Sequence, residues 1–216
     1  MSPIVRRIHA GYLKKPRKYS YNDISVWVEP GVFPPFLTLS TKILLEFIAP
    51  MPLAGKRFLE LGCGCGIISI LAAKKGADVT ASDINQAALK ALEKNAAENH
   101  VALRIVYSDL FGDLKDQMFD YIVINPPYYP RTPKSDAEHA WFCGENFDYF
   151  RKLFAQLPLF MTNANHIYMI LSQDCEIETI KSMAEENHIG FTLALARKKV
   201  GETNYIFELS ITSGSA

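Results

Sequence analysis

The chain has 216 residues, of which 49% are apolar, and its 23 basic and 23 acidic side chains give a formal net charge of zero. This length and composition predict one α/β domain with a full core. No apolar run approaches the ~18 residues that a membrane-spanning helix needs. Because the first residues also lack the apolar core of a signal peptide, we expect a cytoplasmic protein without membrane contact.

The charges are unevenly distributed along the chain. Residues 1–18 contain no acidic side chain, and their basic residues are Arg6, Arg7, Lys14, Lys15, Arg17 and Lys18. We therefore separate a basic N-terminal arm, residues 1–30, from a single domain, residues 31–216. The four cysteines show no C-x-x-C spacing and the histidines are scattered, which favours reduced thiols and indicates no metal site.

From residue 39 onward, the pattern alternates between strands and helices. The expected helices are 39–47, 67–75, 85–98, 147–157 and 176–186. The expected strands are 57–61, 78–82, 103–107, 119–124 and 166–171, followed by a hairpin of 191–196 and 205–211. This alternation indicates an α/β fold with a mostly parallel sheet and helices on both faces. Residues 1–30 show no clear period, and the long connection 129–142 is where a lid or substrate loop would lie.

The first strand of this alternation ends in a glycine-rich turn. Strand 57–61 contains Glu60 and runs into Gly62-Cys63-Gly64-Cys65-Gly66, directly before a helix. Small residues let backbone N–H groups approach a ligand at a helix N-terminus. A dinucleotide-binding G-x-G-x-x-G fingerprint would need glycine at position 67, which is Ile67, so the pattern argues against an oxidoreductase.

Polar residues stand at the ends of the next three strands. Asp83 ends the second strand, and a carboxylate there can accept both hydroxyls of a ribose. A helix cap at Asp83 or Asn85 is the alternative. Asp109 follows the third strand, where a simple turn is the alternative, and Asn125 follows the fourth. Because ligands of open α/β sheets bind at the carboxyl ends of the strands, we expect one common site.

The fourth of these strands runs into Asn125-Pro126-Pro127-Tyr128. The lone pair of an amide or an exocyclic amine is delocalised and must be turned out of the plane before it can be alkylated. The side-chain carbonyl of Asn125 and the backbone carbonyl of Pro126 could each accept one N–H and turn such a group, and Tyr128 offers a ring for stacking. Proline has no N–H that would compete for these acceptors. The motif predicts methylation of a planar nitrogen; a plain proline-rich turn is the alternative.

These motifs resemble those of class I S-adenosylmethionine-dependent methyltransferases. They look most like the short HemK-like methyltransferases, whose known members methylate the glutamine side-chain amide of translation release factors. The segments that share the resemblance, besides the motifs above, are Val32-Phe33-Pro34-Pro35 leading to Thr41, Ala140-Trp141-Phe142-Cys143-Gly144, and Ala194-Leu195-Ala196-Arg197 leading to Gly201-Glu202-Thr203. The resemblance implies a Rossmann-like fold with a seven-stranded, mostly parallel sheet, a C-terminal antiparallel hairpin and helices on both faces.

The resemblance also divides the candidate residues into two sets. The set for S-adenosyl-L-methionine is Glu60, Gly62, Gly64 and Gly66 at its methionine part, Asp83 at its ribose, and Asp109 with Leu110 at its adenine. The acceptor set is Asn125, Pro126 and Tyr128, and S-adenosyl-L-homocysteine would be the product. Trp141 and His139 are further candidates for the acceptor pocket, with packing beneath the lid and an exposed helix face as their respective alternatives.

The identity of the methyl acceptor stays open between two classes. A protein glutamine, as in a release factor, is the first expectation; the N6 amine of an adenine in RNA or DNA has similar geometry and is the alternative. The basic residues of the arm, interleaved with Tyr12, Tyr19 and Tyr21, could follow a phosphate backbone and stack bases, or form a solvated arm. A non-catalytic binding module of the same fold is a third possibility. If the strand order follows the family's, strand 103–107 is an edge to which a small activating subunit could pair.

Overall fold

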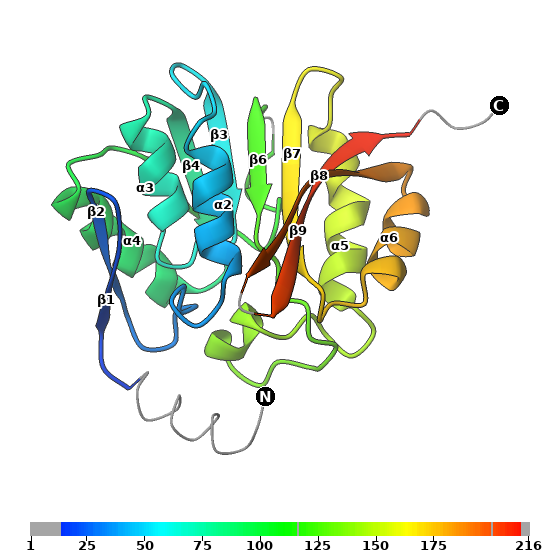
Figure 1. Cartoon of the computed structure of the whole chain (residues 1–216), viewed down its shortest axis with the longest axis horizontal. Helices are drawn as coiled ribbons and strands as arrows, with labels where there is room; N and C mark the ends of the chain where they lie inside the picture. Colours follow the sequence, from blue (N-terminus) through cyan, green and yellow to red (C-terminus); the bar gives the residue numbers. More distant parts are fainter. Residues whose placement is uncertain (1–13, 116, 200, 213–216) are drawn as a thin grey trace.

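A seven-stranded sheet forms the centre of the computed structural model, which describes residues 14–115, 117–199 and 201–212 (Figure 1). The strand order is β5-β4-β3-β6-β7-β9-β8. The strands are β3 (Arg57–Leu61), β4 (Asp78–Asp83), β5 (Arg104–Tyr107), β6 (Tyr121–Ile124), β7 (His166–Ser172), β8 (Ile189–Lys199) and β9 (Glu202–Ile211). Neighbours from β5 to β7 pair in parallel, whereas β9 runs antiparallel to both β7 and β8. The predicted sheet, with its C-terminal hairpin and with β5 at one edge, is confirmed.

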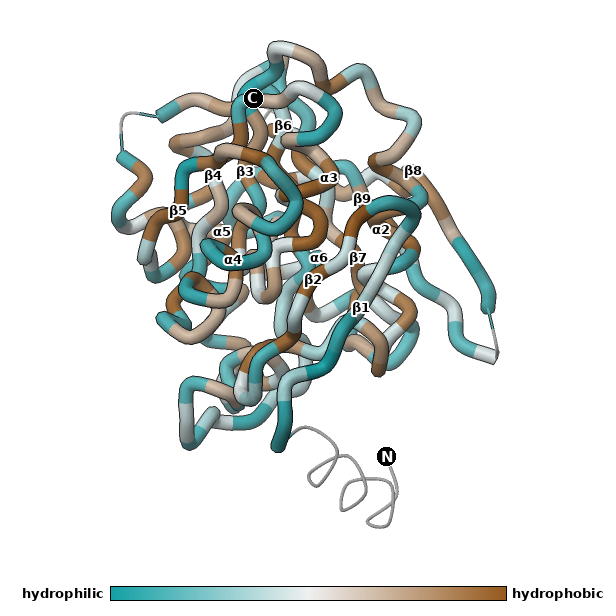
Figure 2. Tube along the Cα trace, turned by 90° about the vertical axis from the view of Figure 1, so that its left-hand side faces the viewer, coloured by the Kyte–Doolittle hydropathy of each residue, from teal (hydrophilic) through white to brown (hydrophobic). Residues whose placement is uncertain are grey.

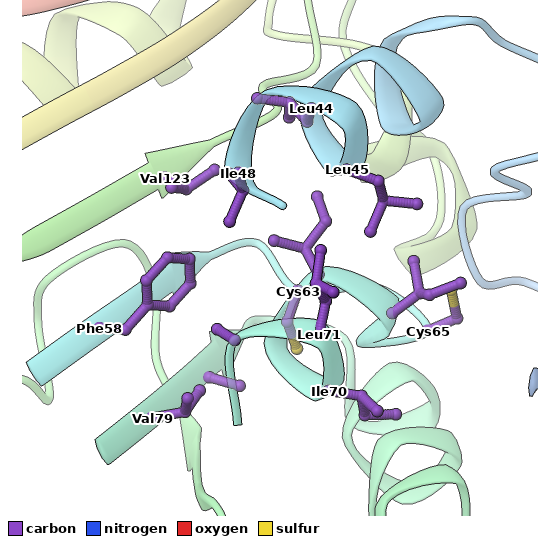
Figure 3. Close-up of a cluster of buried hydrophobic side chains, with 14 of the residues drawn as sticks. Leu44, Leu45, Ile48, Phe58, Cys63, Cys65, Ile70, Leu71, Val79 and Val123 are labelled. Atoms are coloured by element: carbon purple, nitrogen blue, oxygen red, sulfur yellow. The ribbon is translucent and has the colours of Figure 1, made fainter. Parts of the chain in front are cut away.

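Helices cover both faces of this sheet, as the alternation predicts (Figure 1). One face carries α2 (Ser40–Ile48), α3 (Ile67–Lys74) and α4 (Gln86–Glu98), and the other carries α5 (Asp148–Gln156) and α6 (Ile177–Glu185). Successive side chains of a strand point to opposite faces. In β3, Phe58 therefore packs in the core beneath α2 to α4, whereas Leu59 and Leu61 pack in the core beneath α5 and α6. Figure 3 shows part of the first core, where side chains of α2 and α3 gather over Phe58 and Val79 of the sheet.

A second, two-stranded sheet lies near the N-terminal end of the described chain. β1 (Arg17–Tyr21) and β2 (Ile24–Val28) pair antiparallel across a turn at Asn22, whose φ is 52°. The expectation that residues 1–30 have no clear periodic structure is wrong for this hairpin. Ile24, Val26 and Val28 alternate with more exposed residues and are at most 3% exposed in the core beneath α2 to α4. This period of two is the signal that a strand leaves in the sequence.

The rest of the N-terminal segment differs in character from β2. Figure 2 shows the start of β1 as a hydrophilic stretch of the chain. Outside the described residues lie Arg6, Arg7 and Tyr12. Among the residues that the structure describes, no helix combines the length and apolarity needed to span a membrane.

Candidate active site

The carboxyl ends of β5, β4, β3 and β6, four adjacent strands, border a cleft of about 340 Å³. Its wall contains Glu60 from β3, Asp83 from β4, Asp109 after β5 and Asn125 after β6. Parallel strands bring their carboxyl ends to one edge of the sheet, so residues far apart in the chain meet there. The volume lies within the range of small-molecule and cofactor sites.

The glycine turn after β3 has a backbone that only glycine adopts easily. Gly62, Gly64 and Gly66 have φ of 78°, 52° and 76°. A Cβ on Gly66 would lie 2.1 Å from Cδ1 of Leu92 in α4, whereas a Cβ on Gly62 would meet nothing within 4 Å. Gly62 and Gly64 line the cleft and Gly66 does not. Gly66 therefore lets the turn pack on α4, and Gly62 leaves backbone open to a ligand.

Glu60 joins the strand to the start of α3 while facing the cleft. Its side chain is buried, and Oε2 accepts hydrogen bonds from the Ser69 backbone N–H at 2.8 Å and from the Ser69 hydroxyl. This N–H belongs to the first turn of the helix, whose N–H groups have no partner within the helix. Burial raises the pKa of Glu60 to about 8, against the lowering effect of the two hydrogen bonds. A cation bound in the cleft would favour its charged form.

Asp83 accepts hydrogen bonds from two backbone segments that line the cleft. Its Oδ2 accepts from the Gly64 N–H at 2.9 Å, and its Oδ1 accepts from the Asn85 N–H at 2.9 Å. Asn85 is the residue that caps α4, because its Oδ1 accepts from the Ala87 N–H at 2.9 Å. Burial raises the pKa of Asp83 although these bonds lower it. A carboxylate has about four lone-pair sites, so acceptor capacity remains for ligand hydroxyls.

Asp109 and Leu110 form the end of the cleft beneath α5. Lys152 of α5 forms an ion pair with Asp109, and Lys152 also lines the cleft. Leu110 has a positive φ of 55°, and its carbonyl accepts from the Ser108 hydroxyl at 2.7 Å. Lys152 was not among the predicted site residues, because α5 begins 39 residues after Asp109 and no local signal in the sequence shows which helical turn faces the cleft.

The structure separates the members of the acceptor set. Asn125 and Pro127 line the cleft, whereas Pro126 is buried and Tyr128 lies outside the lining. The Tyr128 ring packs against the core beneath α5 and α6, with its centroid 4.8 Å from that of Tyr129. Burial, the largest effect, raises the pKa of Tyr128.

The connection between β6 and α5 forms another wall of the cleft. It passes below the sheet in Figure 1 and contains the short helix η1 (Asp136–Ala140). Its ends are joined, because the Tyr129 N–H donates to the Trp141 carbonyl at 3.1 Å and the Cys143 N–H to the Tyr129 carbonyl at 2.9 Å. His139 is exposed and lines the cleft. Trp141 instead packs on Phe33, another lining residue, with ring centroids 5.1 Å apart.

This fold is the Rossmann-like fold of class I methyltransferases. Residues 23–143, more than half of the chain, match the methyltransferase small domain family. The chain therefore belongs to that family, a class of S-adenosylmethionine-dependent methyltransferases.

Two sequence relatives are named for different methyl acceptors, an RNA and a protein glutamine. Ribosomal RNA small subunit methyltransferase C of Hamiltonella defensa is 35% identical over 131 residues, which are 60% of this chain and 38% of that protein. A candidate protein N5-glutamine methyltransferase of Methanocaldococcus jannaschii is 46% identical over 78 residues, 36% of this chain and 39% of that protein. These matches thus span well under half the length of either relative.

Two solved structures share the fold. The 16S rRNA N2 G1207 methyltransferase of T. thermophilus, in complex with AdoMet and guanosine, has a TM-score of 0.61 at 20% identity, covering 90% of this chain and 50% of that one. The Mtq2–Trm112 complex of E. cuniculi, responsible for methylation of the termination factor eRF1, has a TM-score of 0.62 at 23% identity, covering 85% and 99%. At these identities the likeness shows the fold.

The residues of the cleft fit S-adenosylmethionine, the cofactor of this class. Open backbone at Gly62 suits the close approach of a ligand, and Asp83 keeps acceptor capacity for a ribose. Asp109, at the end of the neighbouring strand, offers an acceptor for an amino group, and Glu60 a carboxylate for an ammonium group. The acceptor groups at these strand ends therefore suit the ammonium, ribose and amino groups of the ligand.

Proposed function

We propose that this protein is an S-adenosylmethionine-dependent N-methyltransferase that acts on a planar amide or amine nitrogen. The observation that carries the proposal is the position of Asn125, which lines the same cleft as Glu60, Asp83 and Asp109. An acceptor-binding amide and three carboxylates suited to the cofactor thus share one cavity. When bound, the cofactor would supply a methyl group on an electrophilic sulfonium.

The protein's own contribution is to orient the acceptor. The Asn125 side-chain carbonyl would accept one N–H of the acceptor and help to turn its lone pair out of the plane. The Pro126 backbone carbonyl would accept the other N–H only after the turn shifts toward the cleft, because Pro126 is buried outside the lining. We propose no general base, because the proton can leave after transfer and good orientation alone can lower a barrier by ~7–11 kcal/mol. Tyr128 would stack on the acceptor only after its ring moves toward the cleft, because the ring now packs against the core.

A protein glutamine, as in a release factor, is the acceptor that we put first. Two relatives support it: the candidate N5-glutamine methyltransferase, at 46% identity, and the Mtq2–Trm112 complex, which is responsible for methylation of eRF1. The Asn-Pro-Pro-Tyr sequence is compatible with this acceptor, since a side-chain amide presents two N–H groups on one nitrogen.

An exocyclic amine of a nucleobase in RNA or DNA, such as adenine N6, is the second candidate, and two observations favour it. The RNA methyltransferase relatives match over a longer segment than the glutamine methyltransferase. Lys14, Lys15 and Lys18 are exposed at the start of β1. The pairing of Arg17 with Val28 places this basic end beside the segment that leads into the cleft at Phe33. A phosphate backbone would be attracted there.

A methyl-transfer assay separates the two acceptors. The protein would be incubated with labelled S-adenosylmethionine and either a release factor or ribosomal RNA, with Asn125→Ala as the control. Label on a release-factor glutamine that is lost in the control supports the first acceptor, and label on an RNA base supports the second. If the cofactor binds and neither acceptor is labelled in the presence of cell extract, the protein is a binding module and the proposed activity is wrong.

We also propose that a small activating subunit pairs with β5. β5 is an edge strand, and a neighbouring fold, Mtq2, is solved in complex with Trm112. An edge strand presents unpaired N–H and C=O groups to another chain. Binding of the subunit should slow amide hydrogen exchange in residues 104–107 and leave β8, at the other edge, unchanged; protection at β8 instead would contradict the proposal.

A further inference from the structure

Two asparagines, Asn95 in α4 and Asn99 directly after its last residue, hold one edge of the N-terminal hairpin. Asn95 Oδ1 accepts from the Trp27 N–H at 2.8 Å, and its Nδ2 donates to the Trp27 carbonyl at 2.9 Å. Asn99 repeats the arrangement one turn later, with Oδ1 accepting from the Ser25 N–H at 3.3 Å and Nδ2 donating to the Ser25 carbonyl at 2.7 Å. Each side-chain amide therefore pairs with one residue of β2 as a neighbouring strand would.

The match between helix and strand has a geometric reason. Residues i and i+4 of a helix are about 6 Å apart along its axis. Residues i and i+2 of a strand are about 6.6 Å apart and turn their backbone polar groups to the same edge. Asn95 and Asn99 thus reach Trp27 and Ser25 without distortion, and α4 takes the place of a third strand.

Asn95 makes one bond that Asn99 does not. Its Nδ2 also donates to the carbonyl of Cys65 at 3.0 Å, and the whole residue is 0% exposed. Cys65 stands in the glycine turn, directly after Gly64, whose N–H donates to Asp83. One buried amide therefore joins the hairpin, α4 and the turn that borders the cleft.

The hairpin continues directly into the wall of the cleft. Asn85 Nδ2 donates to the Gly31 carbonyl at 3.0 Å, and Phe33 lines the cleft two residues later. The Phe33 ring also packs on the ring of Trp141, in the connection after β6, with centroids 5.1 Å apart. The segment from β2 to Phe33 is thus fastened both to α4 and to the connection after β6.

We infer that Asn95 is a positioning residue for the cofactor-binding turn, acting through the Cys65 carbonyl. This inference rests on the proposed use of the cleft for S-adenosylmethionine. Without the Asn95 amide, the Cys65 carbonyl loses its buried hydrogen-bond partner and the glycine turn can move more freely. The backbone N–H groups of the turn, and Asp83, which is bonded to Gly64, are then held less firmly in position for the ligand.

The test compares Asn95→Ala with Asn99→Ala. Each variant removes two of the four hydrogen bonds that join β2 to these asparagines, but only Asn95→Ala also frees the Cys65 carbonyl. The dissociation constant for S-adenosylhomocysteine would be measured by calorimetry at a temperature where both variants are folded. We expect it to rise about tenfold or more in Asn95→Ala and less than about twofold in Asn99→Ala. Amide exchange of residues 64–67 in the ligand-free protein should accelerate in Asn95→Ala alone.

Equal dissociation constants in the two variants, or wild-type exchange of the turn in Asn95→Ala, would overturn the inference. If Asn95→Ala does not fold, Asn95→Ser, a smaller change, takes its place in the same comparison. Failure of the wild-type protein to bind the ligand would be a different result, since it would refute the proposed function; the exchange comparison would still show whether Asn95 holds the turn.

Discussion

At the scale of single residues, two of the carboxylates that we propose for cofactor binding also hold the protein backbone. Asp83 holds the N–H groups of Gly64 and Asn85, and Glu60 holds Ser69 at the start of α3. A substitution that removes such a carboxylate leaves buried N–H groups without partners. Binding and stability must therefore be measured together at these positions, whereas Asn125 at the end of β6 allows the chemistry to be tested alone.

Asn125→Ala should still bind S-adenosylmethionine and transfer no methyl group. The residues proposed to bind the cofactor belong to other strands, but one of the two carbonyls proposed to turn the acceptor is gone. Calorimetry measures whether the variant still binds the cofactor, and a transfer assay measures whether it still moves a methyl group. Retained turnover would remove Asn125 from the mechanism.

Asp83→Ala should weaken cofactor binding by about 1.5–3 kcal/mol, the range for a hydrogen bond to a charged group. Asp83→Asn is the matched control, since its one remaining oxygen can accept from only one of the Gly64 and Asn85 N–H groups. We expect it to bind with an affinity between those of the wild type and the alanine variant. A cofactor dissociation constant that is unchanged in Asp83→Ala would refute a role at the ribose.

Glu60 should make the protein less stable as the pH rises from about 4.5 to about 8. Its folded-state pKa of about 8 lies above the ordinary value of 4.5, so the folded protein binds more protons than the unfolded chain in this window. The stabilisation is complete below pH 4.5 and is lost as the pH passes through the folded pKa. Urea unfolding across this pH range should show that the free energy of unfolding falls less in Glu60→Gln than in the wild type. Equal falls in the two proteins would contradict the assignment to Glu60.

At the scale of elements, the glycine turn and α4 act as one unit. Leu92 of α4 closes over Gly66, and Asn95, three residues further along the helix, bonds to Cys65. The turn is therefore shaped by α4, a helix that follows it in the chain only after α3 and β4. Its three positive φ angles are retained by these contacts, because local sequence preference alone does not select one loop conformation.

Gly66→Ala and Gly62→Ala should separate packing from backbone strain. Both add a Cβ at a positive φ, with a penalty of about 1–2 kcal/mol each. Only Gly66→Ala brings the new Cβ against Leu92, which should add about 1–3 kcal/mol of overpacking. Urea unfolding would measure the difference; equal stabilities would mean that Leu92 moves aside freely.

At the scale of the whole molecule, the chain is neutral but polarised. Residues 1–18 carry only basic charge, and Arg17, the first residue of β1, pairs with Val28, five residues before Phe33 of the cleft lining. The remaining body carries the balancing acidic charge. Such an asymmetry directs a polyanion toward one side of a neutral protein.

Charge reversal at two sites tests this asymmetry. If RNA is the acceptor, Lys15→Glu with Lys18→Glu should weaken RNA binding and reduce the slope of log affinity against log salt by about 1.4–1.8, since two phosphate contacts are lost. Lys56→Glu with Lys115→Glu is the control, because these lysines are also exposed and the net charge changes equally. Filter binding at several salt concentrations measures both. Equal slopes in the two double variants would mean that the basic segment does not contact RNA.

Much of the site was predictable because it follows strands. Apolar runs locate β3, β4, β5 and β6, and the polar residue after each run must reach the same edge once the strands are parallel. The inferred position of Glu60, Asp83, Asp109 and Asn125 on one cleft follows from this rule. The β1–β2 hairpin was missed because basic residues and turn formers obscure its alternation.

The sequence by itself therefore determined the parallel sheet, the glycine turn and the row of strand-end residues, since each leaves a local, periodic signal. Only the tertiary structure decided the contacts made between distant segments: Lys152 beside Asp109, the Tyr128 ring against the core, and Asn95 between Trp27 and Cys65. The Trp27–Asn95 bond joins residues 68 positions apart. A single side-chain hydrogen bond over such a distance has no periodicity in the sequence, and it exists only because the folded core brings its two partners within reach.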